Sequence, residues 1–400
     1  MHRFYNPYKK YGLRRVINAA TSLTNLGGSI PSPEVFRAME DASKSFVHIP
    51  ELQQWAGRHI ADATGAEAGL PTAGASNGLM LAAAACIMKE TELEKYDPLE
   101  RRQGSWSHLS MRLPMHTEGL KTEFIVPKKN RNSYDYAVEC AGGRFKEVGS
   151  EDRTTKDELD AAFDPEKTAA YYFTAREARR SLPLDTVIEV AHRYVAPVIV
   201  DAAAELPPKR KLSLYTKMGA DLVVFSGGKH LAGPNNSGML AGRRDLIKLA
   251  HLQAYPFDGI GRAAKMSRET IVGLVTSLKI YLEHDEKALF NSWERKANWL
   301  AEQLEAIPGI ETGIVYQRTV EDGEPMAPFC YLKLDEKALG ITGRDLVERL
   351  KEGDPSIMTL YEPAFLIEDY RGKVTINPQY MLEGEEEIVV QRTKQLLKAA

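Results

Sequence analysis

The residue of this chain best placed to do chemistry is a lysine in a glycine-flanked loop. Lys229 follows the apolar run Leu222–Ser226 and two glycines, and a second apolar run, Ser237–Ala241, comes shortly after it. The two runs predict strands, and the loop between them presents the lysine. Because desolvation lowers the pKa of an amine, a lysine in this position suits Schiff-base formation with an aldehyde.

A phosphate-binding P-loop is a rival interpretation of the Gly-Gly-Lys sequence. The P-loop pattern needs a glycine where this chain has Val223 and a serine or threonine where it has His230, so the pattern is absent. An ordinary solvated loop lysine is the other alternative. The nearby glycines, which let a backbone approach a ligand closely, favour the Schiff-base interpretation.

An aspartate upstream supplies the matching acid. Asp201 ends the apolar run Val198–Asp201, one predicted helix and one predicted strand before Lys229. An aspartate that pairs with a pyridinium nitrogen and a lysine that holds an aldehyde together indicate a pyridoxal 5'-phosphate site. If the strand continues, the small side chain of Ala203 faces the same way as Asp201 and lets the flat ring lie against it. The alternative is a carboxylate that merely caps the next turn.

The phosphate of such a cofactor needs hydrogen-bond donors, and the start of an alanine-rich helix predicted at Ala75–Lys89 offers them. Unpaired N–H groups and the positive end of the helix dipole favour an anion at this point. A plain N-cap by Ser76 or Thr72 is the alternative, but it leaves the run of small residues unexplained. The predicted phosphate ligands are Gly74, Ala75, Ser76, Asn77 and the hydroxyl of Ser226.

Two further cations, Arg262 and Lys265, follow a pair of glycines and precede a long predicted helix. They are either ordinary surface charge or ligands of a substrate or phosphate anion, in this subunit or in a neighbouring one. Both interpretations stay open. No role is assigned to His48, Arg176 or His230.

The order of predicted elements indicates the fold class. Short β-branched runs alternate with helical stretches through the middle of the chain, which predicts an α/β fold with a mainly parallel sheet flanked by helices. We expect an N-terminal arm and helix over residues 1–45, a large cofactor-binding domain over 46–265, and a linking long helix with a small C-terminal α+β domain over 266–400. The strands predicted for the sheet are Glu123–Val126, Arg144–Val148, Ala169–Phe173, Val198–Asp201, Leu222–Ser226 and Gly238–Ala241.

Composition excludes several other classes of function. The formal net charge is −3, so the chain has no basic field to hold a nucleic-acid backbone. Its three cysteines match no metal-ligand spacing, and we expect no metal and a reducing, cytoplasmic environment. The longest apolar run, Leu79–Met88, is too short to span a bilayer, so we expect no membrane partner.

Three stretches together resemble the fold type I pyridoxal-phosphate enzymes, in particular the selenocysteine-synthase-like group. They are the N-terminal signature Tyr11–Ala19 with Thr24–Gly28, the lysine motif Val223–Pro234, and the loop Gly261–Met266. Within the group the chain is most similar to members of the D-glucosaminate-6-phosphate ammonia-lyase type. The resemblance implies a large cofactor domain, a small C-terminal domain, and a homodimer or larger assembly with active sites at the subunit interface.

The expected reaction is α,β-elimination on a small 2-amino-3-hydroxy acid such as an amino sugar acid, phosphorylated or not. Lys229 is the expected base that removes the Cα proton, and the products are a 2-oxo acid and ammonia. Racemisation and aminotransfer are the nearest alternatives, followed by a selenocysteine-synthase-like transferase and a non-catalytic protein of the same fold. Ile376–Gln379 stands where the resemblance places an acidic residue, a proline and an arginine, which leaves the substrate open.

Overall fold

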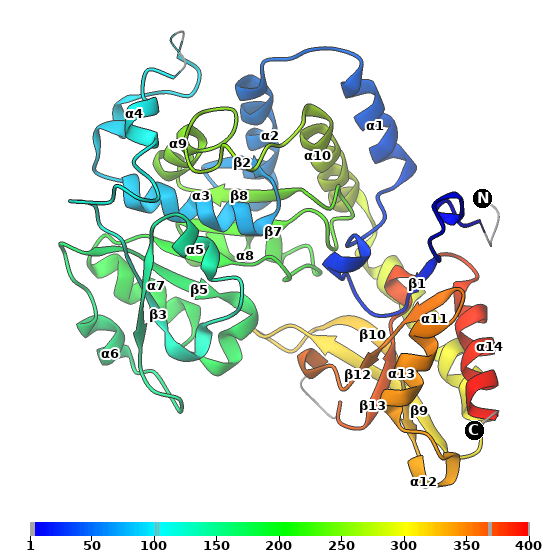
Figure 1. Cartoon of the computed structure of the whole chain (residues 1–400). Helices are drawn as coiled ribbons and strands as arrows, with labels where there is room; N and C mark the ends of the chain where they lie inside the picture. Colours follow the sequence, from blue (N-terminus) through cyan, green and yellow to red (C-terminus); the bar gives the residue numbers. More distant parts are fainter. Residues whose placement is uncertain (1–4, 101, 103, 367–369, 399–400) are drawn as a thin grey trace. The chain divides into compact units, whose positions relative to one another are not determined.

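The chain is organised in two compact units. The computed structural model describes residues 5–100, 102, 104–366 and 370–398. One unit is Ile30–Glu283, and the other combines Met1–Ser29 with His284–Ala400. Figure 1 shows the ribbon of both units. The domain boundaries at residues 45 and 265 that the sequence indicates stay a prediction.

The larger unit is built on a seven-stranded, mainly parallel sheet of order β2-β8-β7-β6-β5-β3-β4. The pairs from β4 through β7 are parallel, and β8 runs antiparallel to both β7 and β2 (Figure 1). The predicted α/β class is therefore confirmed. The strands are β2 (Ala68–Thr72), β3 (Glu123–Pro127), β4 (Arg144–Val148), β5 (Thr168–Thr174), β6 (Val198–Asp201), β7 (Leu222–Ser226) and β8 (Gly238–Gly242).

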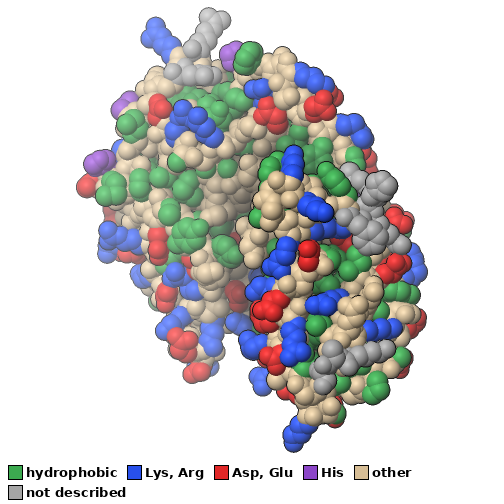
Figure 2. Space-filling view, turned by 45° about the vertical axis from the view of Figure 1, so that its right-hand side comes forward, with side chains coloured by type: hydrophobic (Ala, Val, Ile, Leu, Met, Phe, Trp, Pro, Cys, Tyr) green, Lys and Arg blue, Asp and Glu red, His purple; other side chains and the backbone are tan. Residues whose placement is uncertain are grey.

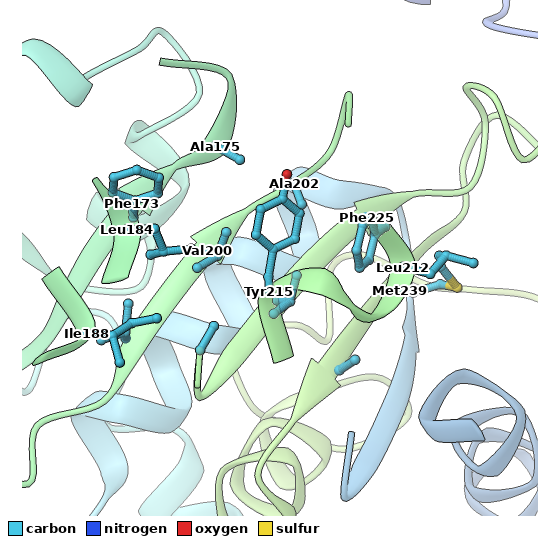
Figure 3. Close-up of a cluster of buried hydrophobic side chains, with 14 of the residues drawn as sticks. Phe173, Ala175, Leu184, Ile188, Val200, Ala202, Leu212, Tyr215, Phe225 and Met239 are labelled. Carbon is cyan, nitrogen blue, oxygen red and sulfur yellow. The ribbon is translucent and has the colours of Figure 1, made fainter. Parts of the chain in front are cut away.

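The central strands are apolar on both faces because helices cover both sides of the sheet. Successive residues enter opposite hydrophobic clusters: Val200 belongs to the cluster that includes residues of α7 and α8, and Ile199 to the one built on α3 and α9. Figure 3 shows part of the first cluster, with Phe225 and Tyr215 near Val200. The helices of this unit are α1 (Pro33–Ser43), α2 (Ile49–Thr64), α3 (Ala75–Met88), α4 (Ser107–Ser110), α5 (Tyr136–Cys140), α6 (Lys156–Ala161), α7 (Leu184–Arg193), α8 (Lys211–Met218), α9 (Arg244–Gln253) and α10 (Arg268–Glu283).

The smaller unit contains an antiparallel four-stranded sheet of order β12-β13-β10-β9. The N-terminal segment joins this unit because β1 pairs in parallel with β11, which buries Ile17. The strands are β1 (Val16–Asn18), β9 (Ile310–Arg318), β10 (Pro325–Leu334), β11 (Ser356–Met358), β12 (Leu360–Tyr361) and β13 (Lys373–Ile376). The helices are α11 (Glu286–Glu305), α12 (Glu336–Leu339), α13 (Gly343–Glu352) and α14 (Glu385–Lys398).

The long helix expected after the Arg262 loop is divided in two. The sequence indicates long amphipathic helical structure over roughly Ser267–Ile307, and the chain forms α10 and α11 there. The break lies at His284 and Asp285, where the Asp285 carboxylate accepts a hydrogen bond of 2.9 Å from the Ala288 amide and starts α11. An aspartate that caps a helix is a local signal, and here it separates the two units.

A helix and a strand of the larger unit approach each other very closely at a pair of glycines. A Cβ added to Gly57 of α2 would lie 2.1 Å from the carbonyl oxygen of Gly69 on β2. The two backbones therefore touch directly, and only glycine fits at position 57 without moving the strand.

We predict that Gly57→Ala lowers the free energy of unfolding by about 1–3 kcal/mol. Alanine is intrinsically the better helix former by about 1 kcal/mol, but the overlap with the Gly69 carbonyl outweighs this gain. Urea unfolding followed by circular dichroism measures the effect. Gln54→Ala, at an exposed position of the same helix, is the control and should change stability by less than about 0.5 kcal/mol. A Gly57→Ala protein as stable as the parent would contradict the contact.

Candidate active site

The parallel pairing of β6 with β7 brings the predicted acid and the predicted lysine to the same edge of the sheet. Asp201 is the last residue of β6 and stands opposite Val224 of β7. Lys229 lies in the loop that follows β7. Carboxyl ends of parallel strands are where such sheets place their ligands. The two side chains are close enough that each one's charge shifts the pKa of the other.

Asp201 is a buried carboxylic acid. Only 7% of the residue is exposed, and burial raises the pKa of its carboxyl to about 6. Two features act in the opposite direction: the Ala203 amide donates a hydrogen bond of 3.0 Å to Oδ1, and Lys229 contributes a positive charge. The acid is therefore poised to ionise when a cation, such as a protonated ring nitrogen, comes next to it.

Lys229 has the environment expected of a reactive amine. Burial lowers the pKa of its ammonium group, and the charge of Arg176 lowers it further, while Asp201 and Glu205 act to raise it. The net direction is downward. A larger share of neutral amine follows, and the neutral form is the one that attacks an aldehyde or accepts a proton.

The loop that carries Lys229 is folded so tightly that glycine is required. A Cβ on Gly227 would lie 2.2 Å from the Ser237 hydroxyl, and one on Gly228 would lie 2.6 Å from the Cα of Asn235. The Gly227 amide also donates to the Ser237 carbonyl at 2.9 Å. The conformation of the loop is thus fixed by backbone contacts, which fixes the point from which Lys229 extends.

The predicted phosphate cradle is an open helix N-terminus next to this loop. Gly74 is the N-cap of α3, with φ of 85° and no side-chain cap, so a plain cap by Ser76 or Thr72 does not explain the sequence. The first helical hydrogen bond runs from the Gly78 amide to the Gly74 carbonyl, so the amides of residues 75–77 precede it. A Cβ on Gly78 would lie 2.9 Å from Val224, so the cradle packs directly on the strand that leads to Lys229.

The donors present fit a cofactor with a phosphate, an aldehyde and a basic ring nitrogen. The side-chain amide Nδ2 of Asn77 is buried and has no hydrogen-bond partner within the chain, while its Oδ1 accepts from the Ala73 amide at 3.1 Å. An unpaired buried donor beside free helix amides suits an anionic group. Lys229 and Asp201 supply the amine and the carboxyl that the other two groups need.

For two residues predicted to contact the cofactor, Ser226 and Ala203, the structure gives only their position in the fold. Ser226 is the half-buried last residue of β7. Ala203 does not continue β6, because the strand ends at Asp201 and Ala203 lies in the following turn, so the alternation that places it under the ring does not apply. Contacts of Ser226 and Ala203 with the cofactor stay predictions.

Arg262 and Lys265 lie on an exposed loop. Both side chains lie over the ring of Tyr255, with Arg262 Cζ at 5.4 Å and Lys265 Nζ at 6.0 Å from its centre. Gln53 holds this loop by donating from Nε2 to the Tyr255 carbonyl at 2.7 Å. The charges that act most on Lys229 are those of Asp201, Arg176 and Glu205, so a role of Arg262 and Lys265 in anion binding stays a prediction.

Sequence reasoning missed several polar residues around the site. Asn130, fully buried after β3, exchanges two hydrogen bonds with the backbone of Thr174, which stands opposite Asp201 in the sheet. Glu205 and Lys211 form a buried ion pair close to Asp201. Charged and amide residues are usually exposed, so nothing local in the sequence marks Glu205 and Lys211 as buried. For Asn130 the available signal was an asparagine three residues after the end of a strand of a parallel sheet.

The described part of the chain contains neither a metal-binding cluster nor a membrane-spanning helix. No group of three or more His, Cys, Asp or Glu side chains in this part of the chain is arranged to hold a metal ion. None of the helices described is long and apolar enough to cross a membrane. Positive and negative side chains are interspersed over the face shown in Figure 2, in keeping with the small net charge.

Comparison with known proteins identifies relatives along the whole chain. Residues 147–326 match the family model for class-V aminotransferases. A 5'-C-glycyluridine monooxygenase-decarboxylase from a Streptomyces species is 31% identical over 399 residues, covering 98% of this chain and 92% of the relative. An L-seryl-tRNA(Sec) selenium transferase of Alkaliphilus metalliredigens is 29% identical over 37% of this chain and 33% of its own length.

A further relative is similar in both sequence and structure. The D-glucosaminate-6-phosphate ammonia lyase of Salmonella typhimurium is 29% identical over 402 residues, which is 99% of each chain. A solved structure of D-glucosaminate-6-phosphate ammonia-lyase matches with a TM-score of 0.81 and covers 99% of both chains. With a lysine and an aspartate at one sheet edge and relatives that extend over nearly every residue, the chain belongs to the class-V aminotransferase family of pyridoxal-phosphate-dependent enzymes.

Proposed function

We propose that this enzyme is an ammonia lyase that performs α,β-elimination on a small 2-amino-3-hydroxy acid, such as an amino sugar acid with or without a phosphate. The observation that carries the proposal is the pairing of Lys229, whose pKa is lowered, with Asp201 at the end of the neighbouring strand. The full-length similarity to a D-glucosaminate-6-phosphate ammonia lyase supports this choice among the reactions open to such a site.

The residues of the site have distinct tasks. When bound, the cofactor supplies an aldehyde that carries the substrate amine and a ring that accepts the electron pair left at the substrate Cα. Lys229 Nζ accepts the Cα proton, and its lowered pKa keeps part of the amine neutral for this purpose. The Asp201 carboxylate stabilises positive charge on the ring nitrogen. Backbone amides of residues 75–77 with the Asn77 side chain hold the phosphate.

The overall reaction balances without an oxidant. The substrate loses its Cα proton and its β-hydroxyl, which together make one molecule of water. The remaining compound is an enamine acid. Water then hydrolyses this enamine to a 2-oxo acid and ammonia. The Streptomyces relative is named for monooxygenation and decarboxylation. Oxygen uptake is therefore the measurement that most directly separates such a reaction from ammonia elimination.

We also propose a homodimer or larger assembly, in the cytoplasm, with Arg262 and Lys265 as ligands of an anion. Both side chains are exposed on a loop that Gln53 holds in place. This exposure supports binding of an anion at a place separate from the charged groups around Lys229 in the same chain. The three cysteines, Cys86, Cys140 and Cys330, are free thiols, which supports a reducing compartment.

The first test is a panel of 2-amino-3-hydroxy acids that includes phosphorylated sugar acids. We expect ammonia and a 2-oxo acid in equal amounts, without oxygen uptake. Lys229→Ala should lose the visible absorbance band of the cofactor-loaded enzyme and at least about 1,000-fold in kcat, because both the amine and the base are gone.

Other results of the panel would exclude a lyase. A change of Cα configuration without ammonia indicates a racemase, and a 2-oxo acid that forms only with an amine acceptor indicates an aminotransferase. Oxygen uptake with release of carbon dioxide indicates chemistry like that named for the Streptomyces relative. A Lys229→Ala protein that keeps both the band and turnover contradicts the assignment of the lysine.

The second prediction concerns the pH dependence of stability without cofactor. The pKa of Asp201 is about 6 in the folded chain and ordinarily near 3.8, so the folded state holds this proton more tightly than the unfolded state. Ionisation of Asp201 therefore lowers stability as pH rises from about 4 to about 6, by about 3 kcal/mol in total. The Asp201→Asn variant has no carboxyl to ionise at this position, so it should not lose this stability as pH rises.

Unfolding of the apoenzyme in urea at a series of pH values measures the difference. The stability of Asp201→Asn minus that of the parent should grow between pH of about 4 and about 6 and then level off. Parallel curves over this range would show that Asp201 is not a buried acid with a raised pKa.

The third prediction is that Arg262→Ala weakens binding of an anion by about 10-fold, as expected for loss of one charge-assisted hydrogen bond. Substrate KM and cofactor affinity are measured together, since either anion is a candidate. Arg58→Ala, at another exposed arginine of the same unit, is the matched control and should change neither quantity. Unchanged values in Arg262→Ala would leave Arg262 as ordinary surface charge.

A further inference from the structure

A buried ion pair lies close enough to Asp201 and Lys229 for its carboxylate to act on both. Lys211 Nζ donates to Glu205 Oε2 at 2.6 Å, and the Tyr215 hydroxyl donates to the same oxygen at 3.2 Å. The exposed fractions of Glu205 and Lys211 are 5% and 0%. Glu205 comes from the turn after β6, whereas Lys211 and Tyr215 lie on α8. In Figure 3 the Tyr215 hydroxyl points toward the same end of β6 as Ala202.

Burial of such a pair needs an explanation other than stability. Removing two charges from water costs several kcal/mol per ion, and well-packed apolar side chains often stabilise a fold as well or better. The hydrophobic cluster around Tyr215, Leu212 and Phe225 shows that apolar packing was available at this place. A charged pair at this place therefore suggests that its charge or its geometry has a function in the site.

The pair closes the turn that holds Asp201. The Glu205 amide donates to the Ala202 carbonyl at 3.2 Å, one residue after Asp201, and the Ala203 amide donates to Asp201 Oδ1 at 3.0 Å. At the other end of the turn, Lys211 is the first residue of α8. The Glu205–Lys211 bond therefore ties the end of β6 to the start of α8 across the turn.

The carboxylate of Glu205 also faces the reactive groups electrostatically. Its negative charge raises the pKa of both Asp201 and Lys229. The other groups that face them are Arg176 after β5, which acts on Lys229, and Asp135 after β3, which acts on Asp201. Tyr172 of β5 lies near enough for Asp201 to raise the pKa of its hydroxyl.

We propose that Glu205, held by Lys211 and Tyr215, is a positioning residue of the active site: it fixes the turn that orients Asp201 and sets the charge balance in which Lys229 works. The inference rests on the proposed roles of Asp201 and Lys229. Lys211 belongs to this arrangement because its ammonium group donates a hydrogen bond of 2.6 Å to Glu205 and so holds the side chain in place.

Glu205→Gln tests the charge while keeping the size of the side chain. Removing the negative charge should lower the pKa of Lys229 further, because Glu205 acts to raise it. The measurement is the pH dependence of the rate at which an amine-reactive acylating reagent modifies Lys229 in the full-length chain without cofactor, followed by peptide mass spectrometry. The pH midpoint of the visible absorbance band with pyridoxal 5'-phosphate is the second readout and should shift in the same direction.

Two further variants separate charge from structure. Tyr215→Phe removes a hydrogen bond to Glu205 but leaves every charge, so the Lys229 midpoint should stay at the value of the parent. Glu205→Gln/Lys211→Met removes both charges and leaves no uncompensated ion, so it should fold and show a smaller shift than Glu205→Gln alone. If the single variant does not fold, the double variant still has to show a shift in the same direction.

A folded Glu205→Gln or double variant with the midpoint of the parent in both readouts would overturn the proposal. So would a shift of equal size in Tyr215→Phe, because this variant keeps the charge of Glu205 and the charge would then not be what sets the Lys229 midpoint. The labelling experiment needs no cofactor, so it gives a result about Glu205 even if Lys229 proves not to hold pyridoxal phosphate. In that case the visible band of the parent would persist in Lys229→Ala.

Discussion

The parallel register of β6 with β7 is the constraint on which the active site depends. Asp201 stands opposite Val224, so the end of one strand and the loop after the other emerge at the same edge of the sheet. Because side chains alternate along a strand, a slip of one residue would move the Asp201 carboxyl to the other face. Hydrophobic clusters on both faces of the sheet fix this register, since Val200 and Ile199 are fully buried on opposite sides.

Around this edge, backbone segments of the candidate site lie so close together that only small residues fit between them. Gly78 lets α3 approach Val224, and Gly238 at the start of β8 would place a Cβ 2.6 Å from the Gly74 carbonyl carbon. The helix N-terminus thereby sits beside the strand that leads to Lys229. Such contacts leave little freedom for adjustment, so the backbone of the helix N-terminus and of the lysine loop is fixed by close contacts.

The sequence predicts the strands that carry Asp201 and lead to Lys229, because the signals for these strands are local. Strongly apolar, β-branched runs give the bounds of β6 and β7 as the structure has them, and glycines mark the lysine loop. What it does not predict depends on contacts between distant segments or on a single capping residue. The burial of Glu205 follows from the position of α8, and the break between α10 and α11 follows from Asp285. The turn at Ala203 follows directly after β6, so the alternation that would place Ala203 beside Asp201 does not continue.

The central claim is that Lys229 binds the cofactor aldehyde, and chemical trapping tests it most directly. The full-length chain is loaded with pyridoxal 5'-phosphate, reduced with borohydride, digested and mapped by mass spectrometry. The account predicts one phosphopyridoxyl group, carried by Lys229. A group found on another lysine instead, or on none, would contradict it.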